Sequence, residues 1–224
     1  MNEFSLVKAD VDNRVDIAIN ESIKTYMNKL SYGMFFDGLE ISFQCYLFDI
    51  LQSELEKVKI HNDEYFTVIP EFNIPLASRN DEIDIAINYA CKNLQKKWLI
   101  ELKYKKKTQS AMDLSVVQSL ADIKDLEGHL DATNNIHYFF FLTDWDTYVK
   151  SNHKGALHDL PMYDGAILEA NKTYFSSGKT VKEEMRKQHY PNGFVFNNTY
   201  TIDYHHVTSN HGKEYWYFAL KIKG

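Results

Sequence analysis

The sequence predicts an α/β fold, with a central mixed β-sheet flanked by helices and a mostly β carboxy-terminal elaboration. The hydrophobic patterns run in the order helix, strand, strand, strand, helix, strand, which is typical of a sheet covered by helices. The run Ile136–Leu142 is continuous, apolar and aromatic, as in a central strand buried on both faces. Hydrophobic residues make up 44% and charged residues 25%, the usual balance of a globular protein.

Two amphipathic helices are expected before the first strand. Apolar residues recur at helical spacing between about residues 15 and 30, and Gly33 then interrupts the pattern. A longer helix is expected between about residues 35 and 59. Its apolar stripe is formed by Leu39, Phe43, Leu47, Ile50 and Leu51.

Three strands follow, at about residues 65–74, 83–88 and 98–104. Pro70 indicates an edge or bulge position for the first of them. A polar turn at 77–81 and a polar connection at 92–96 separate the three strands.

A helix is expected from about residue 112 to 130, before the strand Ile136–Leu142. From about residue 151 the pattern loosens, with a short helix near 180–188 and antiparallel strands at 194–196, 200–206 and 215–222. We therefore expect residues 1–150 to form the core, with its amino-terminal helices. Residues 151–224 would be an elaboration packed on that core within a single domain overall.

Composition excludes several classes of protein. The two cysteines, Cys45 and Cys91, form no disulfide framework, so a reducing, cytoplasmic setting is expected. No apolar run is long enough to span a membrane, and the amino terminus does not have the pattern of a signal peptide. The segment Ser177–Thr180 lacks the earlier glycine of a phosphate-binding loop, because Thr173 stands there, so no organic cofactor is expected.

The third predicted strand places charges in an apolar setting. Because side chains alternate in a strand, Glu101 and Lys103 share one face with Leu99. Burial of two charges costs several kcal/mol unless they are paired or hold a metal ion. The pattern therefore fits either an ordinary ion pair or a metal-dependent phosphodiesterase site.

Other acids have the positions that a metal site needs. Asp84 lies in the preceding strand, which would form a hairpin with the strand of Glu101. Glu40 lies on the longer helix at the margin of its apolar stripe, and Gln44 shares its face one turn later. Glu71 is a spare acid that could take the place of Glu40.

Together these residues resemble the motif of the PD-(D/E)XK nuclease superfamily, which has a restriction-endonuclease-like fold. The resemblance covers about half of the chain, roughly residues 33–143, and Ile83 stands where the motif has proline. It implies that Mg²⁺, or Mn²⁺ in its place, is bound by Asp84, Glu101 and the main-chain carbonyl of Leu102, with Glu40 bonding or ligating within the site. It also implies that Lys103 orients or deprotonates the attacking water.

The same resemblance implies DNA as the substrate. Lys105, Lys106 and Lys107 directly follow the motif strand and are candidates for phosphate contacts, although most lysine runs are solvated. Gln118 corresponds to a glutamine that RecB-like relatives follow with a tyrosine four positions later, but here Asp122 stands at that position. Since double-strand cleavage needs two sites, a homodimer is expected.

The resulting hypothesis is a metal-dependent DNA endonuclease of the restriction or defence type. A repair or recombination nuclease with the same chemistry also fits. Two functions without catalysis remain open: a module that binds nucleic acid or protein, and an interaction protein in which Glu101 and Lys103 form an ordinary ion pair. The net charge of −6 disfavours a general nucleic-acid coat protein but is compatible with a nuclease.

Overall fold

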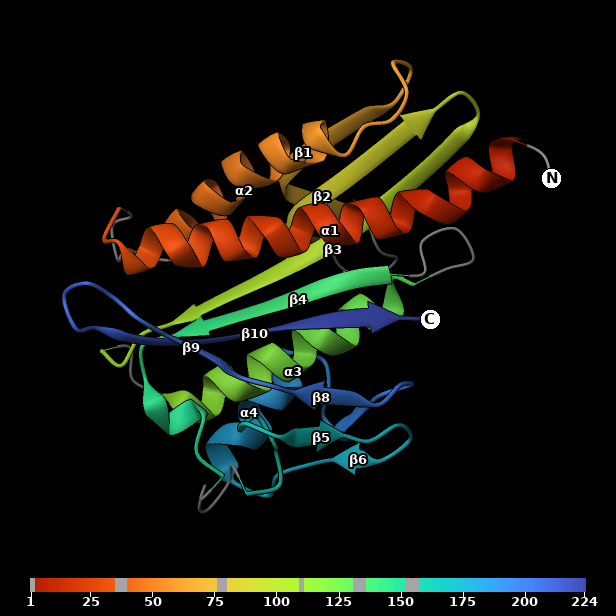
Figure 1. Ribbon diagram of the computed structural model, residues 1–224. Coiled ribbons are helices and arrows are strands. Elements are labelled where there is room, and N and C mark those ends of the chain that lie inside the picture. The colour runs from red at the N-terminus through yellow and green to blue at the C-terminus, as the bar shows by residue number, and fades with distance from the viewer. Residues whose placement is uncertain (1–2, 35–39, 76–79, 109–110, 131–135, 152–157) are drawn as a thin grey trace. The chain divides into compact units, whose positions relative to one another are not determined.

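The computed structural model describes residues 3–34, 40–75, 80–108, 111–130, 136–151 and 158–224 (Figure 1). It confirms the predicted fold class, with a six-stranded mixed sheet of strand order β1-β2-β3-β4-β10-β9, flanking helices and a strand-rich carboxy-terminal region. The chain divides into two compact units. The first contains residues 1–100 and 209–211, and the second contains residues 101–208 and 212–224. The expected division at residue 150 stays a prediction.

The first unit begins with two helices, α1 (Glu3–Ser31) and α2 (Glu40–Lys57), which pack against each other. Helix α1 starts earlier than the sequence predicts, because its buried stripe continues back to Val11. Helix α2 also packs on the strands β1 (Tyr65–Pro75) and β2 (Asn80–Cys91). The first part of β3 (Leu94–Lys105) completes this unit.

Strands β1, β2 and β3 pair antiparallel in sequence order. The predicted polar connection at 92–96 is shorter in the structure, where only Lys92 and Asn93 form the turn and Lys92 has a φ of 53°. Lys96 belongs to β3, where it pairs with Tyr89 of β2, and its ammonium is buried against the carboxylate of Asp12. Pro70 lies in the outer strand β1, as its chemistry predicts. Residues 77–79 of the predicted turn lie outside the described residues.

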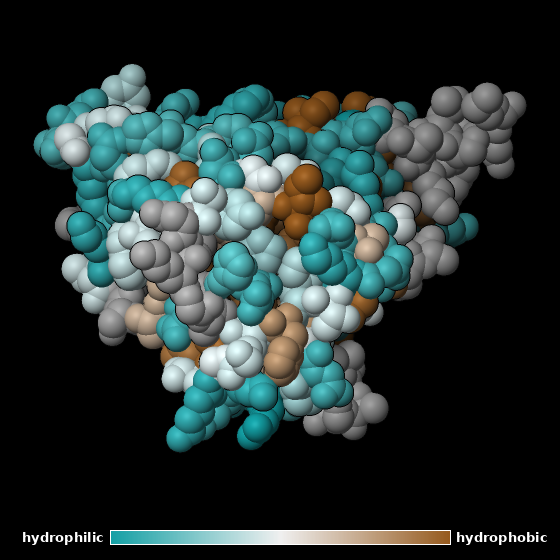
Figure 2. Space-filling view, turned by 90° about the horizontal axis from the view of Figure 1, so that it is seen from below, coloured by the Kyte–Doolittle hydropathy of each residue, from teal (hydrophilic) through white to brown (hydrophobic). Residues whose placement is uncertain are grey.

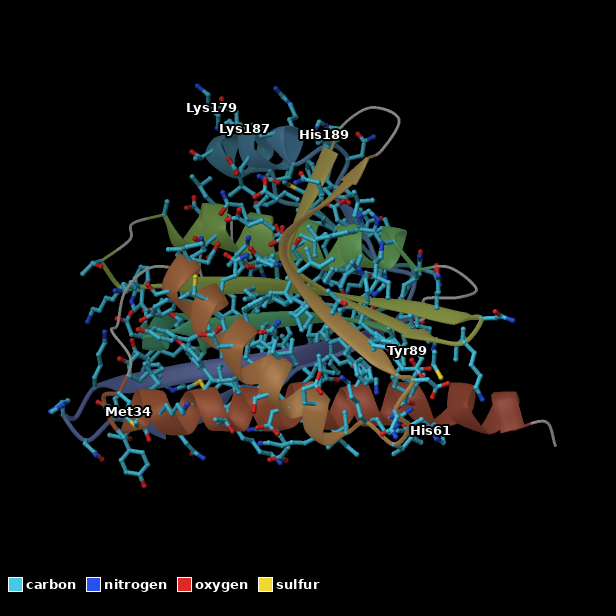
Figure 3. All side chains as sticks on the ribbon, turned by 90° about the horizontal axis from the view of Figure 1, so that it is seen from above. Met34, His61, Tyr89, Lys179, Lys187 and His189 are labelled. Carbon is cyan, nitrogen blue, oxygen red and sulfur yellow. The ribbon has the colours of Figure 1, made fainter. Side chains whose placement is uncertain are left out.

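A buried charge cluster joins three segments of the first unit. The guanidinium of Arg14, on α1, donates to both carboxylate oxygens of Glu64, at 2.9 and 2.7 Å. Glu64 also accepts from the main-chain N–H of Ile60, at 2.8 Å, and from the hydroxyl of Tyr89 on β2, at 2.9 Å. Tyr89 and the neighbouring His61 are labelled in Figure 3. The cluster therefore ties α1 to the start of β1 and to β2.

The second unit is built on β4 (Ile136–Thr143), β9 (His205–Thr208) and β10 (Glu214–Lys223), which pair antiparallel with β10 in the middle. Helix α3 (Met112–Gly128) packs against β4 and β10. Phe141 and Phe218 are register partners, and their rings are stacked at 5.4 Å. Strand β4 is buried along its length, as the sequence predicts for Ile136–Leu142.

Short elements make up the rest of the second unit. They are η1 (Asp146–Tyr148), β5 (Ala166–Leu168), β6 (Thr173–Tyr174), α4 (Lys179–Lys187), β7 (Phe194–Val195) and β8 (Tyr200–Ile202). Strand β5 pairs with β8, and β6 pairs with β7. The predicted strand at 194–196 corresponds to β7, and the predicted helix near 180–188 corresponds to α4. Strands β5 and β6 were not predicted, because so short a strand shows little hydrophobic periodicity.

The predicted strand at 200–206 is wrong in one respect, because it consists of two strands, β8 and β9. They are separated at Tyr204, whose main-chain N–H donates to the carboxylate of Asp164 instead of continuing the ladder. The ring of Tyr204 is buried against Phe141 and Phe218. The chain therefore leaves one sheet and joins another at this residue.

A second buried carboxylate fixes the end of α3. Glu127 accepts from the main-chain N–H groups of Asn197 and Asn198 and from the hydroxyl of Tyr200, at 2.7 to 3.1 Å. The ammonium of Lys124 lies 2.9 Å from the same carboxylate. Glu127 thus holds the segment before β8 against the helix.

Among the described residues, no helix is both long and apolar enough to cross a lipid bilayer. The face drawn in Figure 2 carries hydrophobic side chains singly or in small groups among hydrophilic ones. Such a surface is usual for a folded domain.

The Arg14–Glu64 cluster predicts acid sensitivity. Burial alone raises the pKa of Glu64, but hydrogen bonds from Arg14, Ile60 and Tyr89 lower that pKa to about 2. Because the folded pKa is below the unfolded one, the cluster stabilises the fold above about pH 4.5 and this contribution is lost as the pH falls towards 2. Glu64→Gln should lower the free energy of unfolding at pH 7 by about 3 kcal/mol. It should also flatten the acid limb of the stability curve in urea titrations.

The matched control is Glu21→Gln, which removes an exposed carboxylate paired with Lys24. It should change stability by less than about 0.5 kcal/mol. Equal acid sensitivity of the Glu64→Gln variant and the parent would contradict the role given to Glu64.

The Glu127 cluster predicts a local effect. Glu127→Gln should lower the free energy of unfolding by about 1–3 kcal/mol. The donors now bind two carboxylate oxygens, whereas the amide of glutamine has only one acceptor oxygen. The amides of Asn197 and Asn198 should exchange with solvent faster, as measured by NMR hydrogen exchange. Glu183→Gln, on the exposed side of α4, is the control and should leave both amides unchanged.

Candidate functional site

In the first unit, the helix that carries the predicted helical acid contacts the strand that carries the predicted strand acid. The side-chain amide of Gln44, on α2, donates to the main-chain carbonyl of Asp84, on β2, at 2.7 Å. Glu40 is the first residue of α2 and stands one turn before Gln44 on the same helix face. Gln44 therefore fixes this part of α2 against β2 at Asp84.

The local sequence explains this arrangement. The buried stripe of α2 fixes the helix on the sheet, and Phe43 packs on Tyr26 of α1 at 4.7 Å between ring centroids. In β2, Ile83 and Ile85 are buried on either side of Asp84, which is itself half-buried. A carboxylate thus interrupts an otherwise apolar stretch of strand.

Glu71 lies on the neighbouring strand. It stands between Pro70 and Phe72, whose register partners Ile85 and Ile83 flank Asp84. Glu71 is exposed and has a left-handed φ of 48°, which is uncommon for a residue other than glycine. Its candidacy as a substitute for Glu40 stays a prediction.

The second unit contains the other half of the motif, on β3. Glu101 is only 8% exposed, and Leu102 is fully buried. The ammonium of Lys103 lies 3.0 Å from the carboxylate of Asp122 on α3, and both side chains are largely buried. This pair was not predicted from the sequence. The signal that could have indicated it is the position of Asp122, one turn after Gln118 on α3.

The three lysines after the motif have different surroundings. The main-chain carbonyl of Lys105 accepts from the hydroxyl of Thr143 at 2.6 Å. The ammonium of Lys106 lies 5.6 Å from the ring centroid of Tyr104. The main-chain N–H of Lys107 donates to Asp144 at 2.6 Å, and the Lys107 side chain is exposed. The backbone of this segment is thus fixed by side chains, and its predicted phosphate contacts stay a prediction.

Gln118 has a structural partner. Its amide donates to the carboxylate of Glu184, on α4, at 3.0 Å. Burial raises the pKa of Glu184, but the hydrogen bonds from Gln118 and Gln188 outweigh it, so the pKa lies below its usual value. Gln118 therefore links α3 to α4, and the contact with DNA expected of it stays a prediction.

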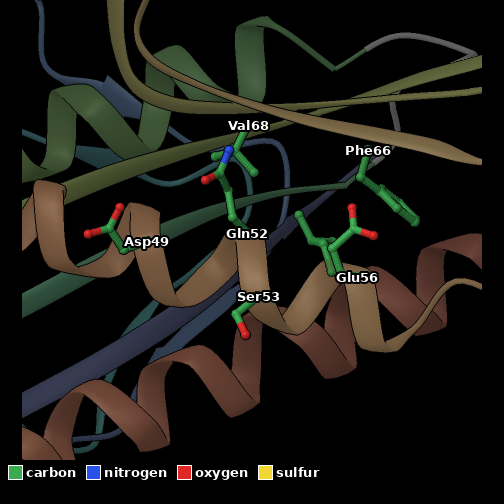
Figure 4. A pocket seen from close by; sticks show the side chains of 7 residues that line it. Asp49, Gln52, Ser53, Glu56, Phe66 and Val68 are labelled. Atoms are coloured by element: carbon green, nitrogen blue, oxygen red, sulfur yellow. The ribbon is translucent and has the colours of Figure 1, made fainter.

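A groove in the first unit lies between α2 and β1 (Figure 4) and has a volume of about 420 Å³. Two carboxylates, Asp49 and Glu56, line it together with the apolar side chains of Phe66 and Val68. Because both charged groups are negative, this groove disfavours a phosphate backbone.

In the described part of the chain, no group of three or more His, Cys, Asp or Glu side chains is placed to hold a metal ion. The predicted ligand set contains only two such side chains at its core, the carboxylates of Asp84 and Glu101, together with a main-chain carbonyl. Asp84 belongs to the first unit and Glu101 to the second. In comparisons with known proteins, no family model, no curated protein and no solved structure matches this chain.

Proposed function

We propose that this chain is a metal-dependent deoxyribonuclease of the restriction or defence type, acting in the cytoplasm. The observation that supports it most is the hydrogen bond from Gln44 to the main chain of Asp84. It connects the helix that bears Glu40 with the strand that bears Asp84. The low exposure of Glu101 and the ion pair of Lys103 give further support.

The chemistry of the donors fits a hard divalent cation. Mg²⁺ prefers carboxylate oxygens and retains some of its water ligands, so two carboxylates and a carbonyl are a suitable set. Asp84, Glu101 and the carbonyl of Leu102 would hold the ion, with Glu40 bonding or ligating beside them. When bound, the ion offsets charge on the phosphoryl oxygens and lowers the pKa of water.

Lys103 has the role of orienting or deprotonating the attacking water and of stabilising charge that develops on the phosphoryl group. Its ion pair with Asp122, at 3.0 Å, limits the positions that the ammonium takes. Positioned charges stabilise a transition state better than mobile ones, because no reorganisation is needed during the reaction. Asp122 is therefore a positioning residue in this proposal.

DNA is the proposed substrate, with a homodimer supplying two sites for the two strands. A repair or recombination nuclease would use the same residues and differ in the structure of the DNA that it cuts. A binding module without catalysis would need none of the acids. Metal dependence and the product of the reaction separate these functions.

The first test replaces the proposed ligands. Wild-type protein should nick supercoiled plasmid only with added Mg²⁺ or Mn²⁺. Asp84→Asn and Glu101→Gln should each lower the cleavage rate at least about 100-fold, because an amide does not neutralise the cation. Gel assays across a metal titration provide the measurement, with circular dichroism to confirm folding.

Glu56→Gln, in the groove between α2 and β1, is the matched acid control and should cut at the parent rate. Metal-independent DNA binding without any cleavage would favour a non-catalytic module. Cleavage that survives both Asp84→Asn and Glu101→Gln would refute the proposed site.

A second test separates Lys103 from its partner. Lys103→Ala should lower the cleavage rate about 100-fold or more, since the group that acts on the water is removed. Asp122→Asn should lower kcat about 10-fold and leave KM little changed, because the ammonium is present but less well placed. Stability loss in both variants without a change in cleavage by the folded fraction would instead favour an ordinary structural ion pair.

A further inference from the structure

The second unit has a cavity of about 560 Å³ that involves none of the motif residues. It lies beside β5 and β6, and its lining includes His158, Tyr163, Ile167, Lys172 and Phe175. The lining thus combines aromatic and aliphatic surface with one lysine and two acids, Asp159 and Glu169. Its aromatic surface suits a ligand that has a flat ring.

The apolar part of the lining is partly open to solvent. Ile167 is 50% exposed, because β5 buries its neighbours Ala166 and Leu168 and turns Ile167 to the other side. Tyr163 and Phe175 are half-buried. A ring that enters the cavity can therefore cover apolar surface without any element having to move.

The framework around the cavity is fixed by hydrogen bonds. The hydroxyl of Tyr174 accepts from the main-chain N–H of Glu169 at 2.6 Å and donates to the carbonyl of Ile167 at 3.2 Å. Lys172 and Glu169, which both line the cavity, form an ion pair at 2.5 Å. The pairing offsets the charge of Glu169, although Asp159 adds one exposed acid to the lining.

Helix α4 brings further cations to Phe175. The ammonium of Lys182 lies 5.2 Å from the ring centroid of Phe175. Lys179, Arg186 and Lys187 are exposed on the same helix, and Figure 3 shows Lys179 and Lys187 pointing away from it. Of the two acids of α4, Glu184 is buried and bonded to Gln118, so Glu183 is the exposed one. The exposed charge of α4 is therefore mainly positive.

We propose that this cavity and α4 form a binding site for a single-stranded nucleic acid. One unpaired base stacks against Phe175 and Tyr163, and its phosphates lie near Lys182 and the other cations of α4. The site deepens the proposed nuclease function by naming the structure of the strand that the enzyme holds. The role of the bound strand as a substrate rests on the proposed nuclease function, whereas the binding itself needs no metal.

Two features favour a strand over other ligands. The cations from Lys179 to Lys187 span about 12 Å along the helix, further than the phosphate of one mononucleotide reaches. A base inside a duplex is already stacked on its neighbours and is not available to Phe175.

The test measures binding without cleavage. Fluorescein-labelled dT20 is titrated with the full chain in EDTA, and fluorescence anisotropy gives Kd at several salt concentrations. Lys182→Gln should weaken binding several-fold and reduce the slope of log K against log salt by about 0.7. Lys182→Arg should restore both values. Phe175→Leu should weaken binding by about 5- to 100-fold, whereas Phe175→Tyr should retain it.

Lys24→Gln is the matched control, since Lys24 is an exposed helical lysine of the first unit. It should leave Kd unchanged, and circular dichroism checks that each variant is folded. Equal binding of dT20 and a duplex of the same length would overturn the proposal. So would parent-like binding by both Lys182→Gln and Phe175→Leu, or binding of thymidine monophosphate as tightly as dT20.

Asp84→Asn separates the two proposals. In EDTA this variant should bind dT20 like the parent, because the cavity contains no motif residue. One outcome is that cleavage requires Asp84 and a metal ion while the Kd for dT20 is unchanged by substitution of Phe175 and Lys182. In that case the cavity proposal fails and the nuclease proposal stands. The reverse result leaves a strand-binding protein without the proposed catalysis.

Discussion

A buried carboxylate must be matched by donors, and each unit of this protein has one that joins separate segments of the chain. In the first unit, Glu64 accepts hydrogen bonds from Arg14 of α1 and Tyr89 of β2. In the second unit, Glu127 accepts hydrogen bonds from two main-chain N–H groups and from the hydroxyl of Tyr200. An unmatched charge at either place would cost several kcal/mol, so these contacts fix which segments meet. Both carboxylates join parts of the chain that hydrophobic periodicity alone would leave independent.

Hydrophobic periodicity was enough to predict the elements that bury a continuous stripe. The helix beginning near Val15 and the strand Ile136–Leu142 are examples, although the helix extends further back because Val11 is also buried. The pattern could not locate the break at Tyr204, since this aromatic side chain is buried as it would be in a continuous strand. Nor could it reveal the pair of Lys103 with Asp122, which depends on how α3 lies along its strand. Local spacing did predict that Gln44 and Glu40 share a face, but not that Gln44 binds the main chain of Asp84.

Net charge says little about partners in this protein, because the charges are distributed unevenly. The overall value is −6, and the groove between α2 and β1 contributes to it through Asp49 and Glu56. Helix α4 has the opposite character, since its exposed side chains are mostly lysine and arginine. Attraction between exposed charges acts over about 10 Å at moderate salt, so a polyanion responds to the nearest helix more than to the total. An acidic protein can therefore carry a surface suited to phosphates.

The ion pair of Lys103 with Asp122 has two consequences for the proposed chemistry that oppose each other. It orders a flexible side chain, which lowers the entropy lost when the reacting groups come together. It also shares the positive charge of Lys103 with a carboxylate, so less of that charge is available to a phosphodiester. A phosphodiester carries its own negative charge and competes with Asp122 for the ammonium. The pair therefore helps a nuclease only where the gain from ordering the ammonium exceeds the loss of the charge that Asp122 offsets.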